Sequence, residues 1–173
     1  ACVAALAEHA RFNAVWTSEG LLEVEEINPG IAVGLDDGLV APALLSAQRL
    51  DLVQTAAAVS DLVERARSQR LRPAELSEAT FTLSNLGMFD VTAFTAIVTP
   101  PQVAIMATGR PVARWIDGDE GPVQASVLTA TLSCDHRAVD GVDAARFVGT
   151  FKAAMEDAEA LFRGAGDLKE AMS

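Results

Sequence analysis

The sequence predicts an α+β protein, a two-layer sandwich in which helices cover a mixed sheet. Half of its 173 residues are hydrophobic, which is enough for one domain with a hydrophobic core. Strand-like and helix-like segments follow one another without the regular alternation of a doubly wound sheet. The chain contains no internal repeat and no low-complexity segment, so residues 1–173 are expected to form a single domain.

Two segments have the residue spacing of amphipathic helices, and Ala1–Ala10 resembles the end of a buried one. Between Asp51 and Gln69 apolar residues recur every three or four positions, and Asp51 with Gln54 forms the pattern of a capping box. A final helix is expected to begin near Val142. Its apolar stripe comprises Val148, Phe151, Met155, Ala158 and Phe162.

Strands are expected where β-branched and apolar residues alternate. Ile31–Leu35 and Leu39–Leu44 flank the turn Asp36–Gly38, which predicts a hairpin because Asp-Gly supplies the backbone geometry of a tight turn. The other predicted strands are Leu21–Glu26, Thr80–Leu86, Gln102–Thr108, Val112–Asp117 and one long strand, Val123–Cys134.

Composition excludes several classes of protein. The net charge of −11 and the lack of a basic face argue against nucleic-acid binding. The sequence contains no run of about 18 apolar residues, so it predicts no membrane span. No cluster of side chains has the spacing of metal ligands. Cys2 and Cys134 are expected to be buried, reduced thiols, since two cysteines make no disulfide framework.

The densest candidate site is the segment Ser133–Gly141, SCDHRAVDG, between the last predicted strand and the last predicted helix. It contains His136 and, four residues later, Asp140. On spacing alone this is equally a strand-end histidine followed by an aspartate that caps a helix. His9, the other histidine, is expected to be structural or solvated.

Five motifs, in order along the chain, give it a resemblance to a known family, the catalytic domains of dihydrolipoyl acyltransferases. These enzymes form the cores of 2-oxo acid dehydrogenase complexes. The resemblance extends to about Phe162. The motifs are Asn13–Trp16 (NAVW), Asp37–Leu39 (DGL), Thr80–Phe89 (TFTLSNLGMF), Thr99–Gln102 (TPPQ) and Asp135–Gly141 (DHRAVDG).

The resemblance implies a fold similar to that of chloramphenicol acetyltransferase and a set of catalytic residues. His136 corresponds to the family's general base, which takes the proton of a thiol. Ser84 corresponds to the serine whose hydroxyl stabilises the tetrahedral oxyanion. Asp140 corresponds to an aspartate expected to hold the loop through an ion pair, with a cation that the sequence does not identify. Asp90 stands where the family often has glycine.

The resemblance also implies that coenzyme A is the cosubstrate. Its channel is expected to pass Asp37, Leu83, Ser84, Gly87 and Gly109, although ordinary turn geometry explains the Asp37–Gly38 turn and Gly109 equally well. Because the chain is acidic, cations must offset the negative charge of this cofactor, and the candidates are Arg110, Arg114 and Arg137.

The family implies a homotrimer, with His136 of one chain facing Ser84 of the next, and usually a larger homo-oligomeric core. The lipoyl group is carried on a domain not present in this chain. Partners are that lipoyl domain and the decarboxylase and dihydrolipoamide dehydrogenase components. Family catalytic domains begin some tens of residues upstream of Ala1, so the domain is expected to be N-terminally incomplete. The abundance of arginine and alanine suggests a bacterial, cytoplasmic protein; a eukaryotic one belongs in the mitochondrial matrix.

Three other functions stay open. The NLGMF and PPQ segments favour acetyl as the acyl group, with branched-chain acyl transfer next and succinyl last. The shape of the pocket decides between these groups, so the first alternative, another acyl group, stays open. A free-standing, coenzyme A-dependent acetyltransferase acting on a small hydroxyl compound is the second alternative. The third is a scaffold that assembles the core without catalysis, against which the presence of Ser84, His136 and Asp140 argues.

Overall fold

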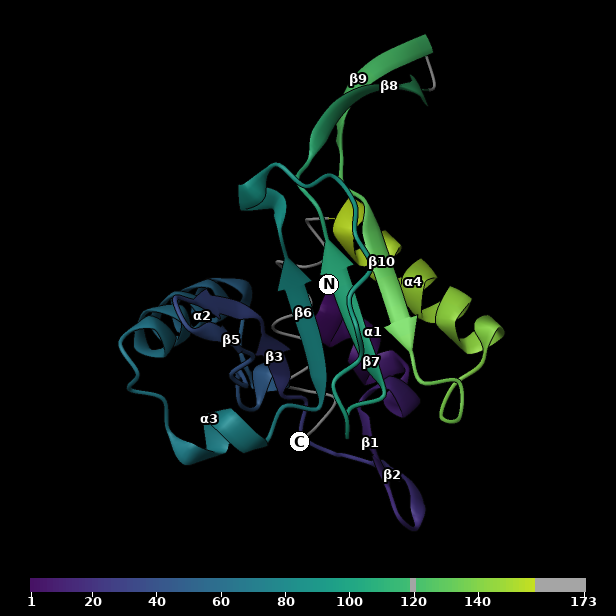
Figure 1. Cartoon of the computed structure of the whole chain (residues 1–173). Helices are drawn as coiled ribbons and strands as arrows, with labels where there is room; N and C mark the ends of the chain where they lie inside the picture. Colours follow the sequence, from purple (N-terminus) through teal and green to yellow (C-terminus); the bar gives the residue numbers. More distant parts are fainter. Residues whose placement is uncertain (119–120, 158–173) are drawn as a thin grey trace.

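A four-stranded mixed sheet with the order β10–β7–β6–β3 lies at the centre of the molecule (Figure 1). In this computed structural model the structure describes residues 1–118 and 121–157. β3 (Pro29–Ile31), β6 (Phe81–Asn85) and β7 (Ala104–Thr108) are parallel, and β10 (Ala130–Cys134) runs antiparallel to β7. The predicted α+β class with a mixed sheet is confirmed.

Three two-stranded hairpins extend from this central sheet. They are β1 (Ala14–Thr17) with β2 (Gly20–Glu23), β4 (Val33–Leu35) with β5 (Gly38–Val40), and β8 (Val112–Gly118) with β9 (Gly121–Val127). The hairpin predicted around Asp36–Gly38 is confirmed, and Gly38 adopts the positive φ of +146° that the turn requires. Pro42 lies beyond the end of β5, as a residue without a backbone N–H should.

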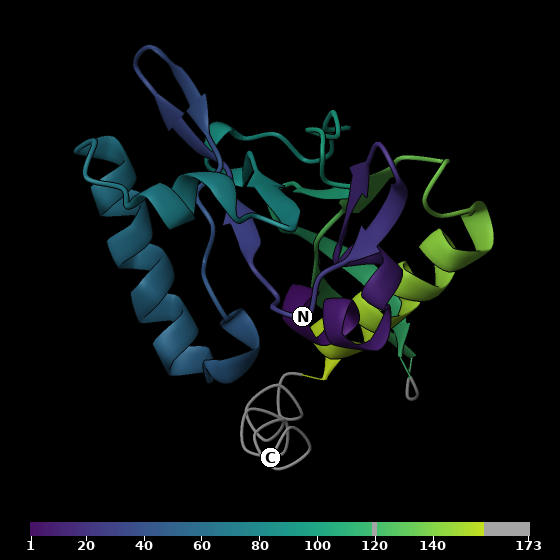
Figure 2. The ribbon, with the colours of Figure 1, turned by 90° about the horizontal axis from the view of Figure 1, so that it is seen from below.

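Four α-helices and three short 3₁₀ helices complete the described part of the chain. The α-helices are α1 (Cys2–Glu8), α2 (Leu52–Arg67), α3 (Pro73–Ser77) and α4 (Gly141–Glu156); the 3₁₀ helices are η1 (Ala10–Phe12), η2 (Ala47–Arg49) and η3 (Gly87–Phe89). Figure 2 shows α1 and α4 together on one side of the sheet and α2 on the far side of the β3 edge. No helix in residues 1–118 and 121–157 is both long enough and apolar enough to cross a membrane.

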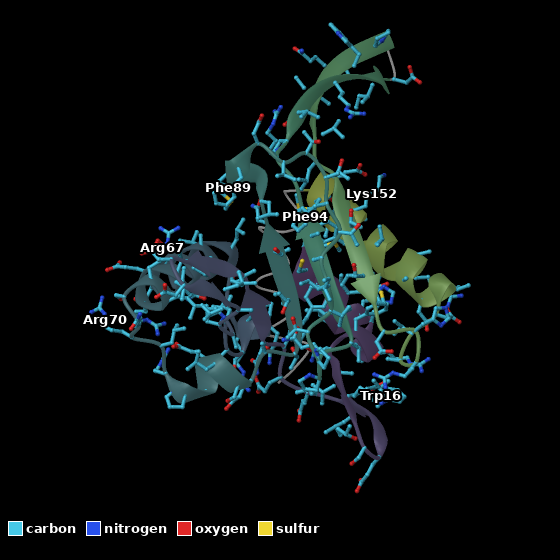
Figure 3. The ribbon with its side chains drawn as sticks, viewed as in Figure 1. Trp16, Arg67, Arg70, Phe89, Phe94 and Lys152 are labelled. Atoms are coloured by element: carbon cyan, nitrogen blue, oxygen red, sulfur yellow. The ribbon has the colours of Figure 1, made fainter. Side chains whose placement is uncertain are left out.

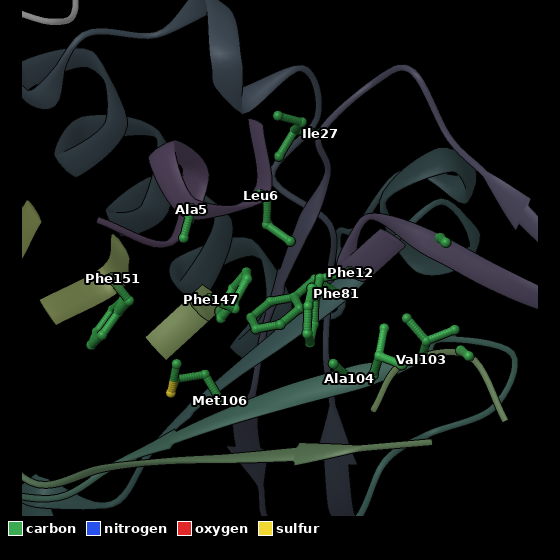
Figure 4. Packing of buried hydrophobic residues seen from close by; sticks show 13 residues of the cluster. Ala5, Leu6, Phe12, Ile27, Phe81, Val103, Ala104, Met106, Phe147 and Phe151 are labelled. Carbon is green, nitrogen blue, oxygen red and sulfur yellow. The ribbon is translucent and has the colours of Figure 1, made fainter. Parts of the chain in front are cut away.

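The main core lies between the sheet and the helices α1 and α4 (Figure 4). Phe147 of α4 packs against Phe12 and Phe81, with ring centroids 4.5 Å and 5.7 Å away. Leu6 of α1 and Met106 of β7 are also almost fully buried there. Along β6, Phe81 and Leu83 point to this core, so Thr82 and Ser84 point to the opposite face of the sheet.

Helix α2 begins as the sequence predicts. Asp51 accepts a hydrogen bond from the backbone N–H of Gln54 at 2.7 Å, and the Gln54 side chain accepts one from the backbone N–H of Asp51 at 3.0 Å. This reciprocal pair is the expected capping box. The helix is tied to α3 by Arg65, which contacts the buried carboxylate of Glu75 at 2.5 Å.

One predicted strand is wrong. The segment Val123–Cys134 forms two strands, β9 and β10, which separate at positions 128 and 129 and belong to different sheets. β9 pairs with β8 in a projecting hairpin, whereas β10 pairs with β7 in the centre. Alternation along one strand does not reveal that its pairing partner changes, because both halves keep the same period of two.

The remaining fold predictions have mixed outcomes. His9 is structural, as expected: its Nε2 lies 2.8 Å from the Thr150 hydroxyl. Cys2 and Cys134 are free thiols, and burial raises the pKa of each to about 11. Helix α4 begins at Gly141, next to the predicted Val142. Its predicted stripe residues Ala158 and Phe162 lie outside the described residues.

Candidate functional site

His136 lies in a short turn between β10 and α4, and its side chain is exposed. The turn is fixed at both ends by backbone hydrogen bonds. The Asp135 N–H donates to the Val103 carbonyl at 2.8 Å, and the Ala138 N–H donates to the Asp135 carbonyl at 3.0 Å. Ala138 and Val139 are buried in the main core. An exposed imidazole on an anchored turn is available to a bound substrate.

Asp140 caps the start of α4. Its carboxylate accepts hydrogen bonds from the backbone N–H groups of Val142 at 2.8 Å and Asp143 at 2.9 Å. These bonds, with smaller contributions from His136 and Arg11, lower the pKa of Asp140. Among the described residues Arg11 pairs instead with Asp143, at 3.6 Å. In the structure Asp140 is thus the N-cap residue of α4.

Ser84 lies on β6, half-buried, on the sheet face opposite α1 and α4. It is paired in register with Ala107 of β7. Leu83 precedes it, and the Leu83 carbonyl accepts a hydrogen bond from Ala32. Gly87 follows in η3, where its N–H donates to the Asn85 side chain at 2.7 Å. Leu83, Ser84 and Gly87 thus lie close together near the carboxyl end of β6.

Gly109 is buried at the carboxyl end of β7, beside this group. A Cβ at this position would lie 2.0 Å from the Thr92 carbonyl oxygen. Its own N–H donates to the Thr129 carbonyl at 3.1 Å. The structure therefore explains this glycine by the close approach of the chain at Thr92. Four of the five residues predicted to line the cofactor channel, all except Asp37, meet at one end of the sheet.

Asp37 and the candidate cations are distributed more widely. Asp37 is exposed at the tip of the β4–β5 hairpin, which projects from the body (Figure 2). Arg110 contacts Asp90 at 2.5 Å, and Arg137 contacts Asp135 at 2.5 Å. Arg114 lies on β8 without an ion pair among the described residues. Asp90 has φ of +64°, a left-handed backbone conformation that glycine adopts without steric cost.

His136 and Ser84 lie at opposite ends of the sheet. The hydrogen bond from Asp135 to Val103 places the start of the turn level with residue 103 of the chain entering β7. Ser84 is level with Ala107 of β7, and its strand β6 lies two strands from β10, which leads into the turn. Four residues along a strand and two strand spacings give a separation of about 16 Å between the two backbones. In Figure 3, Phe89, just after β6, and Trp16, below the turn, mark these two ends. One chain alone does not bring the imidazole and the hydroxyl together.

Two residues near His136, Asp135 and Trp16, were not singled out as site residues from the sequence. Asp135 accepts hydrogen bonds from the Arg137 guanidinium, and that guanidinium lies 4.7 Å from the centre of the Trp16 ring. Residues 1–118 and 121–157 contain no group of three or more His, Cys, Asp or Glu side chains arranged to hold a metal ion.

The fold defines a class. The structure matches that of chloramphenicol acetyltransferase with a TM-score of 0.54 at 14% identity, over 86% of this chain and 72% of that one. The likeness shows the same fold, as the sequence resemblance implied. Residues 1–163 match the family described as 2-oxoacid dehydrogenases acyltransferase (catalytic domain), and the chain belongs to that family.

Similar proteins are acetyltransferase components of large complexes. The dihydrolipoyllysine-residue acetyltransferase component of the mitochondrial pyruvate dehydrogenase complex of Schizosaccharomyces pombe is 37% identical over 160 residues. That match covers 91% of this chain but 33% of the relative, so the chain spans about a third of the length of that curated protein.

Two solved structures superpose closely on this chain. The Azotobacter vinelandii dihydrolipoamide acetyltransferase has a TM-score of 0.87 at 33% identity, over 92% of this chain and 67% of that one. It was studied for the roles of a serine, a histidine 52 residues later and an asparagine four residues further on in its catalytic mechanism. The cubic core of the pyruvate dehydrogenase multienzyme complex matches with the same TM-score, identity and coverage.

Proposed function

We propose that this chain is the catalytic part of an acyltransferase that moves an acyl group, most simply acetyl, between a dihydrolipoyl thiol and coenzyme A. One observation carries the proposal. Ser84, His136 and Asp140 are separated by 52 and four residues, the intervals that separate the three mechanistic residues of the Azotobacter enzyme. An exposed imidazole on an anchored turn gives the middle residue of this set a catalytic position.

The proposed chemistry begins with the proton of a thiol. Thiols are mostly protonated at neutral pH, and the thiolate is the nucleophile, so a base raises the rate of attack. His136 takes that proton, and the thiolate attacks the thioester carbonyl to give a tetrahedral oxyanion. A Ser84 hydroxyl donates a hydrogen bond to this oxyanion. When the intermediate collapses, the departing thiolate recovers the proton from His136, so the base is restored.

The Ser84 that serves this base belongs to a neighbouring copy of the chain in the proposal. The separation of about 16 Å within one chain exceeds the reach of the two side chains, whereas a second copy can supply a hydroxyl at the exposed imidazole. A homotrimer satisfies this requirement for each of its three sites. The likeness to a cubic pyruvate dehydrogenase core supports assembly of such trimers into a larger core.

Coenzyme A is the proposed cosubstrate, and its phosphates need a positive environment. The proposed path runs along Leu83, Ser84, Gly87 and Gly109 at the carboxyl ends of β6 and β7, with Asp37 at its outer end. Arg114 is the cation best able to meet the phosphates, since Arg110 and Arg137 are already paired with carboxylates. The lipoyl group, its carrier domain and the decarboxylase and dihydrolipoamide dehydrogenase components are the proposed partners.

The bacterial and mitochondrial acetyltransferase components among the relatives support a place in a bacterial cytoplasm or a mitochondrial matrix.

The direct test is acyl transfer from acetyl-coenzyme A to dihydrolipoamide, followed as the release of free coenzyme A. His136→Ala is expected to lower turnover by ~10²–10⁴, the usual contribution of a general base. His9→Gln is the matched control, because glutamine can still hydrogen-bond to Thr150, and its turnover should stay within a few-fold of wild type.

The same assay separates the alternatives. A His136→Ala enzyme as active as the control contradicts the proposed mechanism. Transfer to a small hydroxyl compound but not to dihydrolipoamide identifies a free-standing acetyltransferase. No transfer to any acceptor by an assembled wild-type protein identifies a scaffold.

A further inference from the structure

The imidazole of His136 is positioned by its turn and not by a partner of its own. Among the described residues, no hydrogen bond joins the ring to another side chain or to the backbone, although Asp140 lies near enough to interact electrostatically. A catalytic base must be held within about 0.5 Å of its productive position. The contacts of the residues on either side of His136 therefore determine where the imidazole lies.

Those two neighbours, Asp135 and Arg137, are locked to each other. The Asp135 carboxylate accepts the backbone N–H of Arg137 at 3.0 Å and the guanidinium Nε at 2.9 Å, and a second guanidinium nitrogen lies 2.5 Å from the other carboxylate oxygen. This bidentate contact fixes the relative orientation of the two side chains more firmly than a single ion pair does, because the guanidinium and carboxylate planes must match. It also lowers the pKa of Asp135 to about 2.

The same guanidinium attaches the turn to a different part of the fold. It lies over the indole of Trp16, 4.7 Å from the ring centre, within the range of a cation–π contact. Trp16 is itself fixed in β1, and its backbone N–H donates to the Pro101 carbonyl at 2.7 Å. Figure 3 shows Trp16 directly below the loop between β10 and α4. The turn is thus supported from outside by a strand more than a hundred residues earlier in the chain.

We infer that Arg137, held between Asp135 and Trp16, is a positioning residue that orients His136 for catalysis. The inference rests on the proposed function, since it assigns His136 the role of base. It replaces the expectation that Arg137 meets the phosphates of coenzyme A. A guanidinium already occupied by a carboxylate on one edge and an indole on one face has little left for an anionic ligand.

The kinetic test compares three substitutions in the assembled enzyme. Arg137→Met and Trp16→Leu should each lower kcat by on the order of 10²-fold, the effect of a misplacement of about 1 Å, while the KM values for coenzyme A and dihydrolipoamide change by less than a few-fold. Arg137→Lys should lose nearly as much, because lysine keeps the charge but not the planar, two-pronged contact. Arg146→Met, an exposed arginine of α4, is the matched control and should behave as wild type.

Two kinetic results overturn the inference. A rise in the KM for coenzyme A at unchanged kcat makes Arg137 a ligand of the cofactor. Full activity of Arg137→Lys makes its charge, rather than its geometry, the relevant property.

A second measurement does not depend on activity. The chain has two histidines, so ¹³C-labelled histidine gives two ring signals. His9 is the internal reference, because its ring contacts the Thr150 hydroxyl rather than the turn that carries His136. Trp16→Phe, which keeps an aromatic face, should move the His136 signal less than Trp16→Leu, and neither should move that of His9. Unchanged His136 signals in both variants contradict the inference. An inactive wild-type enzyme with the expected signal changes contradicts the proposed function alone.

Discussion

The separation of His136 from Ser84 within one chain leads to a complementation prediction. If each site takes its imidazole from one chain and its hydroxyl from the next, two inactive variants can restore each other. Ser84→Ala should lose ~10²–10³ of turnover, as is usual when an oxyanion donor is removed. His136→Ala should lose a comparable amount or more. Co-expression of the two chains places both in the same assemblies, which we propose to be trimers.

The expected recovery follows from the geometry of a ring. With random mixing at equal amounts, half of the imidazoles and half of the neighbouring hydroxyls are intact, so about one quarter of the sites contain both. Activity should therefore reach about a quarter of wild type, at least about 25-fold above either variant alone. Transfer from acetyl-coenzyme A to dihydrolipoamide measures it, and sedimentation confirms that the assembly is unchanged.

A second mixture gives the decisive control. Wild-type chains co-expressed with chains carrying both substitutions should retain about one quarter of the activity if the site lies between chains, but about half if each chain holds its own site. Recovery of nothing in the first mixture and about half in the second would refute the reasoning from sheet register.

Three further predictions concern individual residues. Glu75→Gln should cost about 3 kcal/mol of unfolding free energy at pH 7, because its two arginine partners lower the pKa of Glu75 from 4.5 to about 2. This stabilisation is complete above pH 4.5 and disappears as the pH falls toward 2. In the same urea titrations the control Glu64→Gln, which removes an exposed ion pair, should cost less than about 0.5 kcal/mol. Gly109→Ala should destabilise on the order of 3 kcal/mol, since its Cβ overlaps the Thr92 carbonyl, and an unchanged Tm would contradict this. Asp140→Asn should keep the helix cap and most activity, while Asp140→Ala lowers both Tm and kcat.

Local patterns predicted the parts of the fold that are decided locally. The capping box at Asp51 and the turn at Gly38 depend on residues a few positions apart, so the sequence contains the whole signal. The division of Val123–Cys134 into β9 and β10 depends instead on which strand pairs with each half. Partner choice is a property of the tertiary structure, and the alternation of side chains does not record it.

The candidate site follows the same distinction. The spacing of Ser84, His136 and Asp140 could be recognised in the sequence. The position of Asp140 before a predicted helix also indicated that it could cap that helix. The support of the turn by Trp16 could not, because an indole and a guanidinium 121 positions apart carry no common local pattern. The acid–histidine–base order of Asp135, His136 and Arg137 was the available signal, since flanking opposite charges can pair across the residue between them.

The order of strands in the central sheet determines when the sheet can form during synthesis of the chain. β3 pairs with β6 across residues 29 and 81, β6 with β7 across 82 and 105, and β7 with β10 across 104 and 134. Every neighbouring pair thus closes a long loop, and such topologies fold slowly because the entropy of closure is lost before the contacts form. A ribosome must release the chain beyond Cys134 before the sheet is complete, and until then the edge of β7 is exposed to chaperones and to other nascent copies.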